Sequence, residues 1–97
     1  MSYETFHDVQ RQLEQLVGDL DAATPRGKTR ARILDAAAQQ FVRHGYRKAS
    51  IDEIAKQAGI GKGTLYLHFA TKTDVLVAAL AREKLRALDL LRAAFSN

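Results

Sequence analysis

The stretch that decides the fold is residues 50–69, which read SIDEIAKQAGIGKGTLYLHF. Ser50 and Glu53 stand three positions apart, the capping-box spacing in which each side chain satisfies the other's free backbone N–H group. The spacing predicts a helix that begins at Ser50. Gly59 ends this helix, because glycine accepts the positive φ of a tight turn. The inward face of the helix carries four apolar residues, Ile51, Ile54, Ala55 and Ala58.

A second short helix is predicted over residues 62–69, with Gly61 as a permissive N-cap. Leu65 and Phe69 are four positions apart and therefore share the face that turns to the core. Ile60 lies in the turn as an apolar plug that fixes how the two helices cross. Two short helices joined by a glycine turn form a helix-turn-helix, whose second helix lies in the major groove of DNA.

Two longer helices are predicted on either side of this motif. Thr24 caps the first, with Pro25 at its first position and Gly45 at its end. Its inward stripe consists of Ile33, Leu34, Ala37, Phe41 and Val42. Thr71 caps the second, which runs from Lys72 to about Phe95. This last helix carries more apolar side chains than a three-helix unit can cover, namely Leu76, Leu80, Leu85, Leu88, Leu91 and Phe95.

The first segment of the chain is predicted to be an amphipathic helix over residues 5–20. Its apolar residues follow a three-and-four spacing and are Phe6, Val9, Leu13, Leu16, Val17 and Leu20. A helix of this length is marginal by itself, so it needs an apolar partner surface in its own domain or on another chain. The fold class is therefore all-α, with a three-helix helix-turn-helix domain, an extra N-terminal helix and a long C-terminal helix.

Charge is distributed unevenly along the chain. Residues 1–24 hold one arginine against five acids, whereas residues 25–97 hold fourteen lysines and arginines against six acids. The basic part is the candidate binder of a polyanion, although a charge run is often only a solvated face. The chain has no cysteine and no apolar run that could span a bilayer, which predicts a cytoplasmic protein of one domain without membrane contact.

These residues resemble the DNA-binding domain of the tetracycline-repressor (TetR) family, a homeodomain-like domain, over residues 28 to about 80. The resemblance rests on 32–37 (RILDAA), Phe41, Gly45, 50–55 (SIDEIA), 58–69 (AGIGKGTLYLHF), Lys72 and Leu76. It implies a bacterial transcriptional regulator, a repressor, that binds double-stranded DNA with the helix over residues 62–69 in the major groove.

The resemblance also implies a role for individual residues. Ser50 and Lys72 would contact phosphate, Lys62, Gly63 and Thr64 would lie at the groove, and Tyr66 and His68 would brace the backbone. Specificity would rest on Lys62, Thr64 and Tyr66, with Asp52 and the basic arm from Arg26 to Arg30 as helpers. The complete set of expected DNA contacts is Lys28, Ser50, Ile51, Asp52, Lys62, Gly63, Thr64, Tyr66, His68 and Lys72.

Members of this family act as homodimers on pseudo-palindromic operators and bind a small-molecule effector through a larger C-terminal domain. The expected organisation is an N-terminal helical extension (1–24), the DNA-binding domain (25–71) and a long helix (72–97) that links toward such a domain. Because the sequence ends at Asn97, it is interpreted either as a fragment of a longer repressor or as a short protein without ligand control.

Two other classes of function compete with DNA binding. A helical protein–protein interaction module with a vestigial helix-turn-helix would use the amphipathic first helix and the apolar last helix. An enzyme is not expected, because the glycine-rich segment 59–64 lacks the preceding strand and the spacing of a phosphate-binding P-loop. No cofactor and no metal site are expected, since His68 has no second ligand three or four positions away.

Overall fold

The computed structural model describes residues 3–96, and this part of the chain folds into five helices without a strand. The helices are α1 (Tyr3–Val17), α2 (Pro25–Lys48), α3 (Ile51–Ala58), α4 (Lys62–His68) and α5 (Lys72–Phe95). The predicted all-α fold class is confirmed: α2, α3 and α4 form the three-helix head, and α1 and α5 are the two additional helices.

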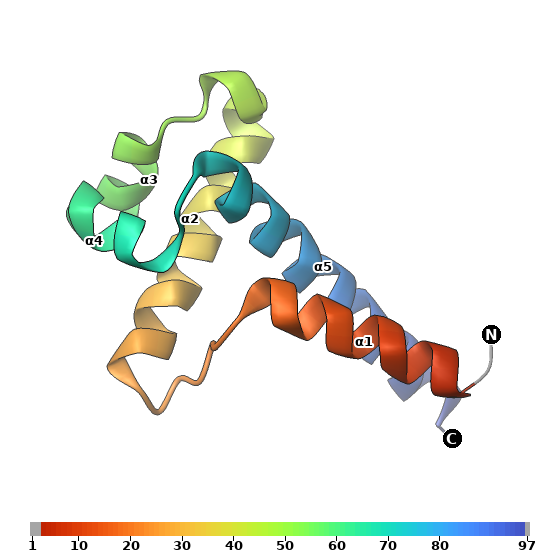
Figure 1. Cartoon of the computed structure of the whole chain (residues 1–97). Coiled ribbons are helices and arrows are strands. Elements are labelled where there is room, and N and C mark those ends of the chain that lie inside the picture. Colours follow the sequence, from red (N-terminus) through yellow and green to blue (C-terminus); the bar gives the residue numbers. More distant parts are fainter. Residues whose placement is uncertain (1–2, 97) are drawn as a thin grey trace.

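The head and the two additional helices occupy different ends of the molecule (Figure 1). Within the head, α3 packs against α2, and α4 packs against α3. Helix α5 leaves the head along α2 and runs antiparallel to α1, with which it makes its most extensive contact. The result is an elongated molecule with principal extents of 43 × 29 × 22 Å, in which α4 lies far from the start of α1.

One hydrophobic core joins the head to α5. The largest side chains that are fully buried come from four helices and are Ile33, Leu34, Ile54, Leu65 and Val75. Small residues fill the closest approaches, since Ala55 and Ala58 of α3 and Ala78 and Ala79 of α5 are also buried. Because every helix of the head contributes to the same cluster, the orientation of α4 is set by the core and not by its own seven residues.

Three hydroxyl caps begin the helices where the sequence predicts them. Thr24 accepts a hydrogen bond from the Gly27 backbone N–H at 3.0 Å, and Ser50 accepts one from Glu53 at 3.0 Å. Thr71 accepts the equivalent bond from the Asp74 N–H at 3.1 Å. Each bond satisfies a donor that lacks a partner in the first helical turn, so these helix starts are fixed locally.

The helix ends follow the glycines. Gly59 adopts the left-handed conformation (φ 77°, ψ 29°) after α3, as predicted. Helix α2 is broken at Gly45 (φ 78°, ψ 166°), and one further turn precedes Ala49. The predicted helix over 5–20 was too long at its C-terminal end, because α1 stops at Val17 and Gly18 has a φ of 78°. This positive φ turns the following residues out of the helix.

Val42 departs from its predicted position in the core. It was assigned to the inward stripe of α2, but its side chain is 89% exposed. The neighbouring Phe41 packs on the edge of the core and lies 5.9 Å, between ring centroids, from Tyr46. Successive residues of a helix point about 100° apart, so only one of the two can face the core at this end of α2.

Helix α1 covers part of the apolar surface of α5. Val17 is buried, and Leu13 and Leu20 pack against the same cluster. Near the other end of the pair, the Arg92 guanidinium lies 5.0 Å from the centroid of the Phe6 ring and donates a hydrogen bond to Gln10. The expected apolar partner of the first helix is therefore α5. The cover is incomplete, because Leu80, Leu90, Leu91 and Phe95 remain exposed.

Candidate nucleic-acid interface

Helix α4 presents a polar and open outer side. Leu65 is fully buried and Phe69, which follows the helix, is also in the core. The residues of the opposite side are all exposed: Lys62, Gly63, Thr64, Tyr66 and Leu67. The predicted division of this helix into a buried apolar face and a free polar face is therefore present. An outer side of this kind can approach another molecule closely without disturbing the core.

Lys62 and Asp52 form an ion pair across the helix-turn-helix. The Lys62 Nζ atom lies 3.5 Å from a carboxylate oxygen of Asp52, and both side chains are more than half exposed. The pair joins the first turns of α3 and α4, so two of the predicted contact residues are brought together. Exposed pairs of this kind stabilise a fold by less than about 1 kcal/mol. Lys62 can therefore exchange Asp52 for another anion at small cost.

The start of α3 places Ser50 and Ile51 in different environments. The half-buried Ser50 uses its hydroxyl as the cap described above. The Ile51 side chain is buried in the core. The predicted DNA contact at Ile51 is thus left to its backbone N–H, which belongs to the first helical turn and has no partner within the helix.

His68 faces inward more than the other predicted contact residues of α4. Its side chain is only partly exposed, and its Nδ1 atom is buried without a hydrogen-bond partner. Burial lowers the pKa of His68 below its usual 6.5, and the positive charges of Arg30 and Arg26 lower it further. The imidazole is therefore neutral at neutral pH, which weakens the expectation that it attracts a phosphate.

Lys72 closes the junction between α2 and α3 from the first position of α5. Its Nζ atom donates to the carbonyl oxygens of Ala49 at 2.9 Å and Arg47 at 3.3 Å. The same ammonium lies 4.3 Å from the centroid of the Tyr46 ring. Two of its three N–H groups are thus directed to the protein, and one remains for the phosphate contact that the sequence predicts.

The basic segment at the start of α2 divides into an exposed and a buried part. Arg26, Lys28 and Arg32 are exposed, whereas Arg30 is 8% exposed. The assignment of Arg30 to a DNA-binding arm was therefore wrong. Arg30 precedes Ile33 by three positions and Leu34 by four, so the helical period already places it on the inward face of α2.

Arg30 is a brace inside the fold. It donates from Nη1 to the His68 carbonyl oxygen at 3.0 Å and from Nη2 to the Val17 carbonyl oxygen at 2.7 Å. Its guanidinium also lies 4.4 Å from the centroid of the Phe69 ring. Sequence reasoning also missed two further supports of the head. Arg82 of α5 pairs with Asp35 at 2.8 Å, and Gln57 of α3 bonds to Gln39 and Gln40.

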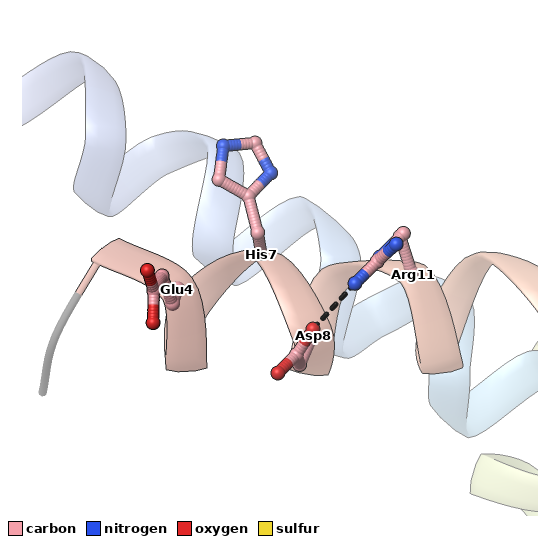
Figure 2. Close-up of a pocket in the computed structure, with 4 residues that line it drawn as sticks. All are labelled: Glu4, His7, Asp8 and Arg11. Carbon is pink, nitrogen blue, oxygen red and sulfur yellow. Dashed lines mark hydrogen bonds and ion pairs between the residues drawn. The ribbon is translucent and has the colours of Figure 1, made fainter.

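A hollow on α1 is lined by Glu4, His7, Asp8 and Arg11 (Figure 2). Asp8 and Arg11 form an ion pair one turn apart, and His7 points away from the Asp8 carboxylate.

Across residues 3–96, no group of three or more His, Cys, Asp or Glu side chains is placed to hold a metal ion. Over the same residues, no helix has both the length and the apolar character needed to cross a membrane.

Comparison with known proteins relates the sequence of this surface to a known family. Residues 33–79 match the profile of the bacterial regulatory proteins, tetR family. Over 58 residues, 60% of this chain and 26% of the relative, the sequence is 45% identical to the HTH-type transcriptional activator FasR of Mycolicibacterium smegmatis. Over 54 residues, 56% of this chain and 25% of the relative, it is 48% identical to the HTH-type transcriptional regulator SrpR of Pseudomonas putida.

A third relative is the fatty acid metabolism regulator protein of Bacillus subtilis, with 43% identity over 54 residues, 56% of this chain and 27% of the relative. The chain thus spans about a quarter of the length of each of these three relatives. No solved structure matches the sequence significantly.

Proposed function

We propose, from the premise that residues 33–79 belong to the tetR family of bacterial regulatory proteins, that this chain binds double-stranded DNA sequence-specifically and represses transcription. The observation that carries the proposal is the division of α4. Leu65 and Phe69 anchor the helix in the core, and Lys62, Thr64 and Tyr66 are exposed on its outer side. A helix anchored in this way is suited to the major groove.

In this proposal, the outer side of α4 reads base edges and neighbouring residues hold the DNA backbone. Lys62 and Thr64 reach base edges, since lysine donates to guanine and threonine contacts either hydrogen-bonding groups or a thymine methyl group. Lys28, Ser50, Tyr66 and Lys72 bind phosphates, which fix the position of the protein without reading the sequence. The excess of fourteen basic over six acidic residues in 25–97 supports attraction to DNA.

Repression is the finer part of the proposal. A protein bound over a promoter blocks access of the polymerase, and this requires nothing beyond tight DNA binding. One relative is named an activator, FasR, so the direction of regulation needs its own test. A reporter gene downstream of the selected site should lose expression when the chain is produced; a gain of expression would assign activation.

The organisation of the chain is proposed to follow the same scheme, with a homodimer on a pseudo-palindromic operator. Residues 25–71 form the DNA-binding domain, residues 1–24 support it, and residues 72–97 link it to the dimer-forming part. Exposed apolar residues in the second half of α5, among them Leu90, Leu91 and Phe95, support the last point. The family resemblance implies that a small-molecule effector binds to a domain that follows α5.

The test is selection of bound duplexes from a random pool, followed by affinity measurements across a salt series. We expect selected half-sites, with selection relaxed at one position in Lys62→Ala. In Lys28→Ala, which removes a proposed phosphate contact, the log–log salt slope should become shallower by about one. Thr64→Ala should relax selection at one position. Lys84→Ala, an exposed lysine on α5, is the matched control. Equal affinity and selectivity in the parent and in both α4 variants would contradict the proposal.

A second candidate is a helical protein–protein interaction module, favoured by the exposed leucines and Phe95 of α5. It predicts a stable complex or oligomer whose formation does not depend on DNA, together with no salt-sensitive binding to any duplex. Sedimentation of the chain alone and with the random pool distinguishes this module from a DNA-binding regulator.

A further inference from the structure

Leu67 is an exposed apolar side chain on the helix that the proposed function places in the major groove. Its side chain is 81% exposed, although Leu65, two positions earlier, is fully buried. Single exposed leucines are ordinary on protein surfaces. The position of Leu67 on α4 is what makes it informative.

Leu67 and Gly63 lie on the same line along α4, because residues four apart in a helix are neighbours on one face. This line is opposite to Leu65, so it forms the outermost ridge of the helix. A Cβ atom built on Gly63 would meet no other atom within 4 Å. Helical side chains lean toward the N-terminus, and Leu67 therefore lies over the turn that Gly63 leaves bare.

The groups beside this ridge are polar. Lys62 and Tyr66 lie on one side of the line and Thr64 lies on the other, and all three are exposed. Lys62 can donate to bases or phosphates, whereas the leucine side chain has no hydrogen-bonding group. In the major groove, the base edges display a single apolar group, the C5-methyl group of thymine. An apolar side chain at the crest of a groove-facing helix therefore has one favourable partner there.

We propose that Leu67 is a specificity-determining residue that reads thymine through its C5-methyl group. This inference rests on the proposed function, since it requires α4 to lie in the major groove. Packing of the leucine methyl groups on the thymine methyl group removes apolar surface of both from water. Cytosine carries only a hydrogen atom at C5 and an amino group at the neighbouring C4, so the contact discriminates between pyrimidines.

The experiment uses the full chain and a duplex obtained by the selection described above. Each thymine of the site is replaced in turn by deoxyuridine, which removes the methyl group and leaves the hydrogen-bonding groups unchanged. We expect one thymine in each half-site whose replacement weakens binding by about fourfold, the size expected for one buried methyl group. The same replacement should leave the affinity of Leu67→Ala unchanged. Val42→Ala, an exposed apolar residue on α2, should respond to the replacement like the parent.

The outcomes separate the two proposals. If the parent binds no duplex selectively, the proposed function fails and the role of Leu67 fails with it. If the parent binds selectively but no deoxyuridine replacement weakens binding, the proposed function stands and the thymine contact is refuted. If the replacement of thymine by deoxyuridine weakens the binding of Leu67→Ala as much as that of the parent, another residue makes the methyl contact.

Discussion

Arg30 donates a 2.7 Å hydrogen bond from Nη2 to the backbone carbonyl of Val17, the last residue of α1. From Nη1 it donates a second bond to the carbonyl of His68, the last residue of α4. The last carbonyls of a helix lack partners within the helix and carry partial negative charge. One guanidinium therefore satisfies two helix ends and couples the N-terminal extension to the helix that is proposed to enter DNA.

Replacement of Arg30 by methionine is expected to destabilise the fold. The methionine fills much of the same space but leaves the Val17 and His68 carbonyls without their donor. Loss of hydrogen bonds to a charged, buried group should lower the free energy of unfolding by about 2–4 kcal/mol. Urea denaturation measures the change. Arg26→Met is the control, because Arg26 is exposed on the same helix; equal stability of the two variants would contradict the bracing role.

Gly27→Ala is expected to disturb the connection between α1 and α2. A Cβ atom on Gly27 would lie 2.0 Å from the carbonyl oxygen of Asp21. Asp21 is itself held in place, since its side chain accepts a bond from the Ala23 N–H and its carbonyl accepts one from Thr24. The loop must shift to admit the methyl group, which should lower the free energy of unfolding by about 1–3 kcal/mol. Thermal or urea denaturation measures this change. Unchanged stability would show that this loop moves freely.

The pKa of His68 predicts how stability depends on pH. Because burial lowers this pKa in the folded state, the unfolded chain takes up the proton first as the pH falls through about 6.5. The free energy of unfolding therefore decreases on acidification from pH 7.5 to pH 5. Above this range, His68 does not contribute to the pH dependence of stability. Unfolding of His68→Gln should depend less on pH across the window. His44→Gln, on an exposed residue of α2, controls for the loss of an imidazole; identical pH profiles for the parent and His68→Gln would contradict the prediction.

Caps and turns were predictable from sequence because they are decided within three or four residues. Thr24, Ser50 and Thr71 each bond to a backbone N–H three positions ahead, and Gly59 ends α3 by its own conformation. These signals, together with the apolar spacing, give the order of the helices and the outer side of α4. They depend on no knowledge of what packs against each helix.

Features that depend on distant partners were not predictable in the same way. The helical period places Arg30 on the inward face of α2, but it does not reveal the partners of Arg30, which are carbonyls 13 and 38 positions away. Lys72 meets Ala49 only because α5 packs along the end of α2. Val42 is the opposite case, an apolar residue that the spacing places in the core and the fold leaves exposed. Apolar spacing does not reveal where the helices that cover α2 end.

Asp52→Asn is expected to strengthen DNA binding. The carboxylate pairs with Lys62 in the free protein and would repel phosphates in the complex. Because the pair is exposed, the free energy of unfolding should change by less than about 1 kcal/mol. Affinity for the selected duplex should rise several-fold, and more at low salt because salt screens the repulsion. Asp89→Asn, at an exposed residue of α5, changes the net charge equally and is the control. An equal gain in both variants would assign the effect to net charge alone.

Gly63→Ala is expected to separate folding from DNA binding. Gly63 is helical and a Cβ atom there meets nothing within 4 Å, so alanine should leave stability unchanged or raise it by about 0.5 kcal/mol. In the proposed complex, the added methyl group stands on the ridge of α4 where the helix meets the groove. Steric overpacking there should lower the affinity by about tenfold. The contrast with Gly27→Ala is diagnostic, since the same chemical change destabilises the fold at one glycine and affects only binding at the other. If Gly63→Ala binds the selected duplex as tightly as the parent, the first turn of α4 does not approach the base edges, and the reading side of this helix must be sought elsewhere.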